Sequence, residues 1–204
     1  PSNTVNAEID QKPWGIAPAI SEQIYTLEDA LLFAGMQMVI LRNADVIKIA
    51  CQSLLTNISA CIMTEKNGEY WLQTIYYPFH YFATYAKGTV LKTASIGPCY
   101  SCAEFDGVPY VDSLVVWNEE DQELVIFAVN RSEEELQKAE VDLQDFEIQH
   151  VIESICMTAE NKKMTNMEQH DAVIPKKEKN VEIETGRCQI TLQPLSFNMV
   201  RLAV

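Results

Sequence analysis

Three polar side chains, Gln52, Ser53 and Asn57, directly follow a short apolar run and form the cluster best placed for chemistry. Amides in such a position hydrogen-bond either the hydroxyl groups of a sugar or the backbone at the end of a strand. The residues alone leave these two roles open. In a barrel of alternating strands and helices, the carboxyl ends of the strands carry the active site. Gln52 is therefore the first candidate for binding a substrate.

Other side chains give weaker signals. Trp14 is the large anchor of a proline-containing opening segment, where it either plugs a loop or stacks on a sugar face, and it is the second candidate for substrate binding. Cys99 and Cys102 form a lone CxxC, and the three histidines do not supply the further ligands that zinc needs. Phosphate loops and the HExxH and GxSxG motifs do not occur in the sequence. We expect two loop cysteines there, and no metal or cofactor.

The charge balance narrows the range of partners. The net charge is −14 and the isoelectric point is near 4.5. Such a chain repels phosphate backbones and anionic lipid surfaces, so neither nucleic acid nor a membrane is an expected partner. No apolar run reaches the roughly 18 residues of a membrane span. A neutral ligand such as a sugar fits this balance.

The six cysteines are expected to be reduced. The chain has 204 residues, of which 48% are hydrophobic, so it does not need disulfides to build a core. Cys51 ends an apolar run, where a free thiol behaves as a small hydrophobe. Free thiols lean weakly towards a cytoplasmic location, and the sequence leaves the compartment otherwise unknown.

The first half of the chain predicts helix, strand, helix after an opening loop. Thr26 and Asp29 form a capping box for a helix that runs to about Arg42 and stops at Asn43. This helix is apolar almost all round, so most of its faces must be covered. The run Val46–Cys51 is typical of a buried parallel strand. A second helix is expected over 72–86, with a proline inside it.

The second half predicts a β-sandwich. From about Thr89 the apolar pattern changes to a period of two, with polar turns between short runs. The expected strands lie at 114–117, 124–129, 141–143, 150–155, 189–192 and 199–204, and residues 161–180 form a polar break. The pattern divides the chain into residues 1–88 and 89–204.

Seven blocks, in order, resemble the α-L-arabinofuranosidases of glycoside hydrolase family fifty-one. The resemblance runs from about Trp14 to Leu202. The blocks are Tyr25–Leu31, Asn43–Cys51, Ile62–Gly68, Trp71–Phe79, Val108–Asp112, Phe127–Ser132 and Leu195–Leu202.

The resemblance implies a mainly β fold: a C-terminal jelly-roll β-sandwich, residues 89–204, preceded by the last helix–strand–helix of a truncated (β/α)₈ barrel, residues 1–88. The seventh helix would be Thr26–Arg42, the eighth strand Val46–Cys51 and the eighth helix Leu72–Ala86. It also implies hydrolysis of terminal arabinofuranosyl residues, with retention, from arabinose-containing oligo- or polysaccharides. Retention uses two carboxylates about 5–5.5 Å apart.

Neither of the family's two carboxylate motifs occurs in the chain. The nucleophile and the acid/base are therefore expected upstream of Pro1, and the chain is expected to be inactive alone. The family's substrate-contacting glutamine aligns with Leu54 here. Gln52 lies two residues earlier, which is one side-chain repeat along a strand, so it points to the same face.

The alternative is an independent β-sandwich module that binds carbohydrate through aromatic side chains on one face. Its candidates are Trp117, Phe127, Phe146 and Phe197. For a barrel remnant, in contrast, we expect exposed apolar surface on the helix from Leu27 to Leu41. Such a surface drives association and favours a homo-oligomer.

Overall fold

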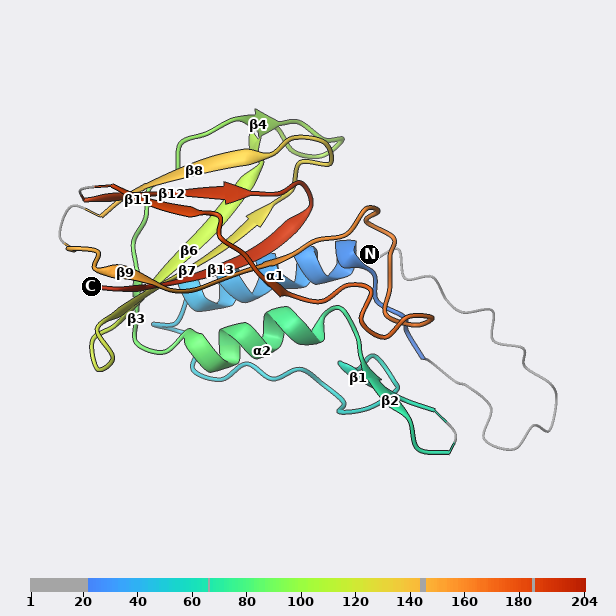
Figure 1. Cartoon of the computed structure of the whole chain (residues 1–204). Helices are drawn as coiled ribbons and strands as arrows, with labels where there is room; N and C mark the ends of the chain where they lie inside the picture. Colours follow the sequence, from blue (N-terminus) through green and yellow to red (C-terminus); the bar gives the residue numbers. More distant parts are fainter. Residues whose placement is uncertain (1–21, 66, 144–145, 185) are drawn as a thin grey trace.

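The computed structural model describes residues 22–65, 67–143, 146–184 and 186–204, and they form three layers (Figure 1). Helices α1 (Leu27–Arg42) and α2 (Tyr76–Tyr85) form the first layer. An antiparallel six-stranded sheet is the second, in the order β10-β9-β13-β7-β6-β3, and a three-stranded sheet, β11-β12-β8, is the third. Two short hairpins, β1-β2 and β4-β5, lie outside these sheets.

The strands have the following bounds. In the six-stranded sheet they are β3 Thr89–Leu91, β6 Val111–Asn118, β7 Glu123–Asn130, β9 His150–Met157, β10 Lys176–Lys177 and β13 Ser196–Ala203. In the three-stranded sheet they are β8 Gln137–Asp142, β11 Val181–Glu184 and β12 Arg187–Leu192. The hairpins are β1 Ile62–Thr64 with β2 Tyr70–Leu72, and β4 Cys99–Tyr100 with β5 Val108–Pro109.

The middle sheet is buried on both faces, which explains why its strands read as continuous apolar runs. In β7, Leu124, Ile126 and Ala128 pack in the core between the two sheets. The alternate residues, Val125 and Phe127, pack in the core between the sheet and the helices. Because side chains alternate along a strand, one run of apolar residues serves two cores. The mainly β, sandwich-containing fold expected from the sequence is confirmed.

Helix α1 forms as predicted. The side chain of Thr26 accepts a hydrogen bond from the backbone of Asp29, and the Asp29 carboxylate accepts one from the backbone of Thr26. Asn43 ends the helix and donates back to it. The capping box satisfies two of the amide groups that the first turn leaves unpaired.

Helix α2 is shorter than predicted. It begins at Tyr76, because Tyr70–Leu72 pairs instead with Ile62–Thr64 to form the β1-β2 hairpin. Met63 and Trp71 face each other across that hairpin and pack with Ile24. Pro78 therefore lies in the first turn of α2, where its missing N–H costs no helical hydrogen bond.

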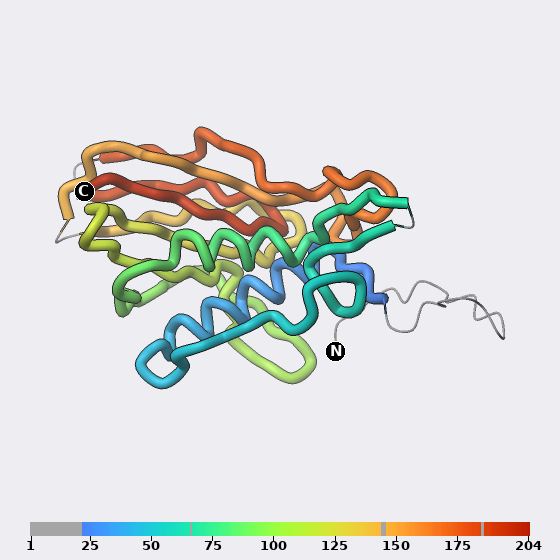
Figure 2. Tube along the Cα trace, turned by 90° about the horizontal axis from the view of Figure 1, so that it is seen from below, coloured from blue at the N-terminus to red at the C-terminus, as the bar shows by residue number. Residues whose placement is uncertain are grey.

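The predicted strand at Val46–Cys51 is wrong. Val46 ends the turn that follows α1, residues 47–51 have no regular secondary structure, and Val46 and Ile49 are 77% and 83% exposed. Cys51, expected to be buried, is exposed as well. A strand needs hydrogen bonds from its neighbours, and the described chain has no parallel partner for this run. Figures 1 and 2 place the segment on the side of the helices that faces away from the sheets.

The exposed apolar surface predicted on α1 is confirmed. Leu27, Ala34 and Met38 are completely buried against the sheet, whereas Leu32, Met36 and Val39 are each more than half exposed. The helix thus buries one face in the sandwich and leaves the other uncovered. Among the described residues, neither helix is long and apolar enough to cross a membrane.

Candidate functional site

Gln52 lies beside the amino-terminal half of α1. It lines a small cavity of about 150 Å³ together with residues that include Tyr25, Phe33 and Ile75. Its Nε2 donates to the carbonyl oxygen of Ser59 at 3.1 Å, which fixes the direction of the amide. The structure therefore puts the predicted residue at a hollow lined by the start of α1 and the residue before α2.

A buried glutamine, Gln73, organises the backbone around this hollow. Its Nε2 donates to the carbonyl oxygens of Gln23 and Ala60, at 2.9 and 2.8 Å, and its Oε1 accepts from the N–H of Tyr25 at 2.9 Å. A primary amide can donate two hydrogen bonds and accept two, and the side chain of Gln73 makes three of these four. The sequence analysis missed Gln73; its polar type within the apolar run Trp71–Phe79 was the available signal.

The polar contacts continue from Gln73 to Gln52. The hydroxyl groups of Tyr25 and Ser59 both donate to Oε1 of Gln23, at 2.8 and 3.2 Å. Burial raises the pKa of the Tyr25 hydroxyl, which therefore stays a neutral donor. Together with the bond from Gln52 to Ser59, these contacts hold both chain segments that approach the amino end of α1.

Of the other positions singled out in the sequence, the described residues Asn57 and Leu54 do not line this hollow with Gln52. The Asn57 side chain bonds the backbone N–H and the hydroxyl of Thr64, so it caps the neighbouring strand. Leu54, the aligned position of the family glutamine, is exposed and has a positive φ of 60°. Trp14 lies outside the described residues, so its role stays a prediction.

The β9-β10 connection, residues 158–175, ties the sandwich to this end of the helices; we call it the strap. The N–H groups of Leu27 and Glu28, in the first turn of α1, donate to carbonyl oxygens of the strap at 2.9 Å each. Asn166 is fully buried and donates to the carbonyls of Leu72 and Val173 at 3.0 and 3.1 Å. The strap thus fixes both the start of α1 and the end of β2.

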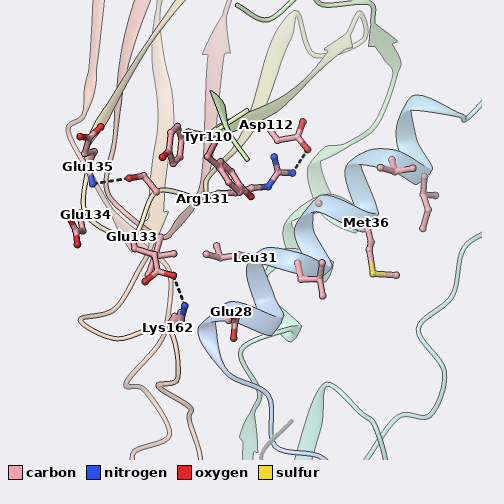
Figure 3. Close-up of a pocket in the computed structure, with 17 residues that line it drawn as sticks. Glu28, Leu31, Met36, Tyr110, Asp112, Arg131, Glu133, Glu134, Glu135 and Lys162 are labelled. Carbon is pink, nitrogen blue, oxygen red and sulfur yellow. Dashed lines mark hydrogen bonds and ion pairs between the residues drawn. The ribbon is translucent and has the colours of Figure 1, made fainter. Parts of the chain in front are cut away.

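A second, larger hollow of about 1010 Å³ lies between the exposed side of α1 and the edge of the sandwich (Figure 3). Its apolar wall comes from α1, including Leu32 and Met36. The Asp112 carboxylate in its polar wall is held by Arg42 and Arg131, with an oxygen–nitrogen distance of 2.8 Å to Arg131. The Asp112 carboxylate thus joins the end of α1 to the edge of the sandwich through its two arginine partners.

All six cysteines are free thiols. Cys61, Cys156 and Cys188 are buried, and burial raises the pKa of each thiol to about 11. Cys99 and Cys102 are exposed. Among the described residues, no group of three or more His, Cys, Asp or Glu side chains could hold a metal ion.

In the described part of the chain, the four candidate aromatic side chains of the sandwich do not form an exposed row. Phe127 and Phe197 are completely buried. Trp117 packs on Phe146, with ring centroids 4.9 Å apart, at the margin of the core between the sheets. The structure therefore does not favour the independent carbohydrate-binding module.

Comparison with known proteins agrees with the fold. The sequence model of the α-L-arabinofuranosidase C-terminal domain matches residues 3–196. An intracellular exo-α-(1→5)-L-arabinofuranosidase of Halalkalibacterium halodurans is 41% identical over 98% of the chain, and one of Bacillus subtilis is 40% identical over 96%. The chain spans only 40% and 39% of the lengths of these relatives.

Solved structures of arabinofuranosidases have the same fold as this chain. A family 51 α-L-arabinofuranosidase from Bifidobacterium longum superposes with a TM-score of 0.85 and 29% identity, covering 94% of this chain and 38% of that one. An arabinofuranosidase from Thermotoga maritima shares the fold with a TM-score of 0.80 at 19% identity, covering 93% of this chain and 41% of that chain. The chain belongs to the C-terminal domain family of the α-L-arabinofuranosidases, within glycoside hydrolase family 51.

Proposed function

We propose that the chain is the C-terminal part of an enzyme that removes terminal α-L-arabinofuranosyl residues, with retention, from (1→5)-linked arabinose-containing glycans. The family match over residues 3–196 carries this proposal. The linkage follows the names of the two relatives that are at least 40% identical. The nucleophile and acid/base are supplied by the portion of the protein that precedes Pro1, so the chain is inactive alone.

The arrangement of the helices supports a place in a barrel for residues 1–88. In a (β/α)₈ barrel each helix begins at the edge where the preceding strand ends, which is the catalytic edge. The starts of α1 and α2 lie at the same end of the described chain, next to Gln52 (Figure 1). We assign α1 as the seventh helix and α2 as the eighth.

Gln52 is the substrate-binding residue of this proposal. Its Nε2 is engaged by Ser59, so its Oε1 remains to accept a hydrogen bond from a sugar hydroxyl. Because the bond to Ser59 already orients the amide, substrate binding does not carry the entropic cost of ordering this side chain. The structure leaves the role of Trp14 open, and we retain it as a second candidate contact.

The uncovered side of α1 supports the rest of the assembly. Leu32, Met36 and Val39 would contact the remaining part of the barrel, since an uncovered apolar helix face marks an interface. We further propose a homo-oligomer for the whole enzyme. We also propose a cytoplasmic location, because the relatives from Halalkalibacterium halodurans and Bacillus subtilis are named intracellular.

The test is hydrolysis of an aryl α-L-arabinofuranoside. The isolated chain should release no aryl group, whereas the chain joined to its preceding portion should release it. In the joined protein, Gln52→Ala should raise KM about tenfold, as expected for loss of one well-placed hydrogen bond. Gln189→Ala, at a half-buried position of β12 in the three-stranded sheet, is the matched control and should leave KM unchanged. Activity of the isolated chain would contradict the proposal.

A further inference from the structure

The β1-β2 hairpin presents one exposed aromatic ring at the end of the molecule that holds Gln52. On its inner side, Met63 and Trp71 are buried. On its outer side, Tyr70 is 68% exposed and stands opposite Thr64 in the register of the hairpin. Packing within the described chain therefore does not explain why a tyrosine occupies this position.

The hairpin belongs to the loop that leads from Gln52 to α2. Gln73 follows β2 directly, and its N–H donates to the carbonyl of Cys61 at 2.9 Å, which closes the base of the hairpin. Side-chain bonds of Gln73 join the same base to Gln23 and Tyr25. The ring of Tyr70 thus projects from an element whose base is hydrogen-bonded to Tyr25, a residue that lines the hollow at Gln52.

The strap supports the hairpin from behind. The ring of His170 stacks on Trp71, with centroids 5.5 Å apart and planes 17° apart, and its Nε2 lies 4.0 Å from a Glu65 oxygen. Asn166 donates to the carbonyl of Leu72. These contacts come from the strap and fix the hairpin in place. An aromatic ring on a fixed support binds a flat ligand surface without a large cost in ordering.

Polar groups lie next to Tyr70 on the outer side. The Asn57 side chain bonds both the backbone and the hydroxyl of Thr64, at 2.8 and 3.0 Å, directly across from Tyr70. An apolar ring face beside hydroxyl and amide groups matches a sugar, which has an apolar face and a hydroxyl rim.

We propose that Tyr70 stacks on the sugar unit next to the one that is cleaved off, so that the outer side of the β1-β2 hairpin is the leaving-group subsite. This inference rests on the proposed function, and it assigns to this chain a role in substrate selection that Gln52, at the cleaved residue, does not fill. Tyr70 acts by binding and takes no part in bond cleavage.

The test compares two substrates with the whole enzyme, in which this chain is joined to its preceding portion. α-L-Arabinofuranosyl fluoride has a single-atom leaving group and cannot reach Tyr70. Linear (1→5)-linked arabinotriose places two further sugars beyond the cleaved bond. Tyr70→Ala should lower kcat/KM for the triose about threefold to tenfold, the range for loss of one ring contact, and leave kcat/KM for the fluoride unchanged.

Two further variants make the result specific. Tyr70→Phe keeps the ring and should retain most of the activity on the triose. Phe105→Ala removes an aromatic side chain of similar exposure, 64%, from the turn between β4 and β5. It should leave kcat/KM unchanged for both substrates.

The outcomes separate the two proposals. A wild-type enzyme that cleaves neither substrate refutes the proposed function, and this inference with it. A wild-type enzyme that cleaves both, with an unchanged ratio of the two rates in Tyr70→Ala, refutes the inference alone. A variant that changes its mass by light scattering while the ratio stays constant would instead make Tyr70 a contact between subunits, which also overturns the subsite.

Discussion

Two methionines on α1 allow the uncovered helix face to be tested with one type of substitution. Met38 is completely buried between α1 and the sheet, whereas Met36, two residues earlier, is 54% exposed. The substitutions Met36→Ala and Met38→Ala remove the same atoms from the same helix. Any difference in their effect therefore comes from the environment of the side chain.

The magnitudes follow from burial. In the isolated chain, Met38→Ala should lower the free energy of unfolding by about 2–5 kcal/mol, which is the range for truncating a buried methionine. Met36→Ala should change it by no more than about 0.5 kcal/mol. The proposed contact with the rest of the barrel would bury the exposed half of Met36 when the chain is joined to its preceding portion. Full burial of such a side chain contributes about 1.5–3 kcal/mol, so Met36→Ala should then cost about 1–2 kcal/mol.

Urea unfolding followed by tryptophan fluorescence measures both values. Dilution of the isolated chain is the control, because self-association would bury the same face and add a concentration-dependent cost. Equal costs for the two variants in the isolated chain would refute the assignment of the two helix faces. A joined protein that tolerates Met36→Ala as well as the isolated chain does would refute the interface with the barrel.

Three further predictions concern the described contacts. Asn166→Ala should lower the free energy of unfolding by about 2–4 kcal/mol in urea titrations, because it leaves buried backbone groups without partners. Asp112→Asn should cost about 1 kcal/mol, and less in high salt, since both of its arginine partners are partly exposed. Burial raises the pKa of the Cys61, Cys156 and Cys188 thiols in the folded state to about 11, above the unfolded value near 9. Their contribution to the free energy of unfolding is therefore complete below pH 9, and it is lost as the pH rises towards about 11 because the unfolded chain loses these protons first. The urea midpoint should therefore fall between pH 8.5 and about 10.5, and a midpoint that rises over this window would contradict the burial of these thiols.

The sequence predicted correctly the elements that depend on residues close together in the chain. The capping box of Thr26 and Asp29 located the start of α1 to the residue. The strands β6 and β7 were found because their apolar runs flank a polar turn. A paired strand across a short turn and a capped helix both depend on residues near in sequence, and these are the features that a single sequence records well.

The segments that were predicted wrongly depend on distant partners. Val46–Cys51 has the composition of a central strand, but composition cannot supply the neighbouring strands. The run Trp71–Phe79 is mostly apolar, so its pattern did not separate the end of β2 from the start of α2.

The candidate site shows the same division. Gln52 was found because it follows a strand-like run, a position that can be read directly from the sequence. Gln73 and Asn166 were missed because their amides bond backbone groups that lie roughly 10 to 90 residues away in the chain. The strap looked like a polar break, and the same polarity that suggested a loop supplies the side chain that fixes the hairpin.

Helix α1 connects these observations, because it belongs to two cores at once. Its buried face is part of the core beneath the six-stranded sheet, and its first turn is capped by backbone carbonyls of the strap. If its other face packs in the barrel, neither the sandwich nor the last barrel helices can unfold without exposing apolar surface of the other. The two parts should then unfold in one transition, since separate transitions require an interface that can open at little cost. The strap would also transmit a change in the sandwich to the hairpin that carries Tyr70. The C-terminal domain would thus shape the mouth of the active site as well as stabilise the barrel.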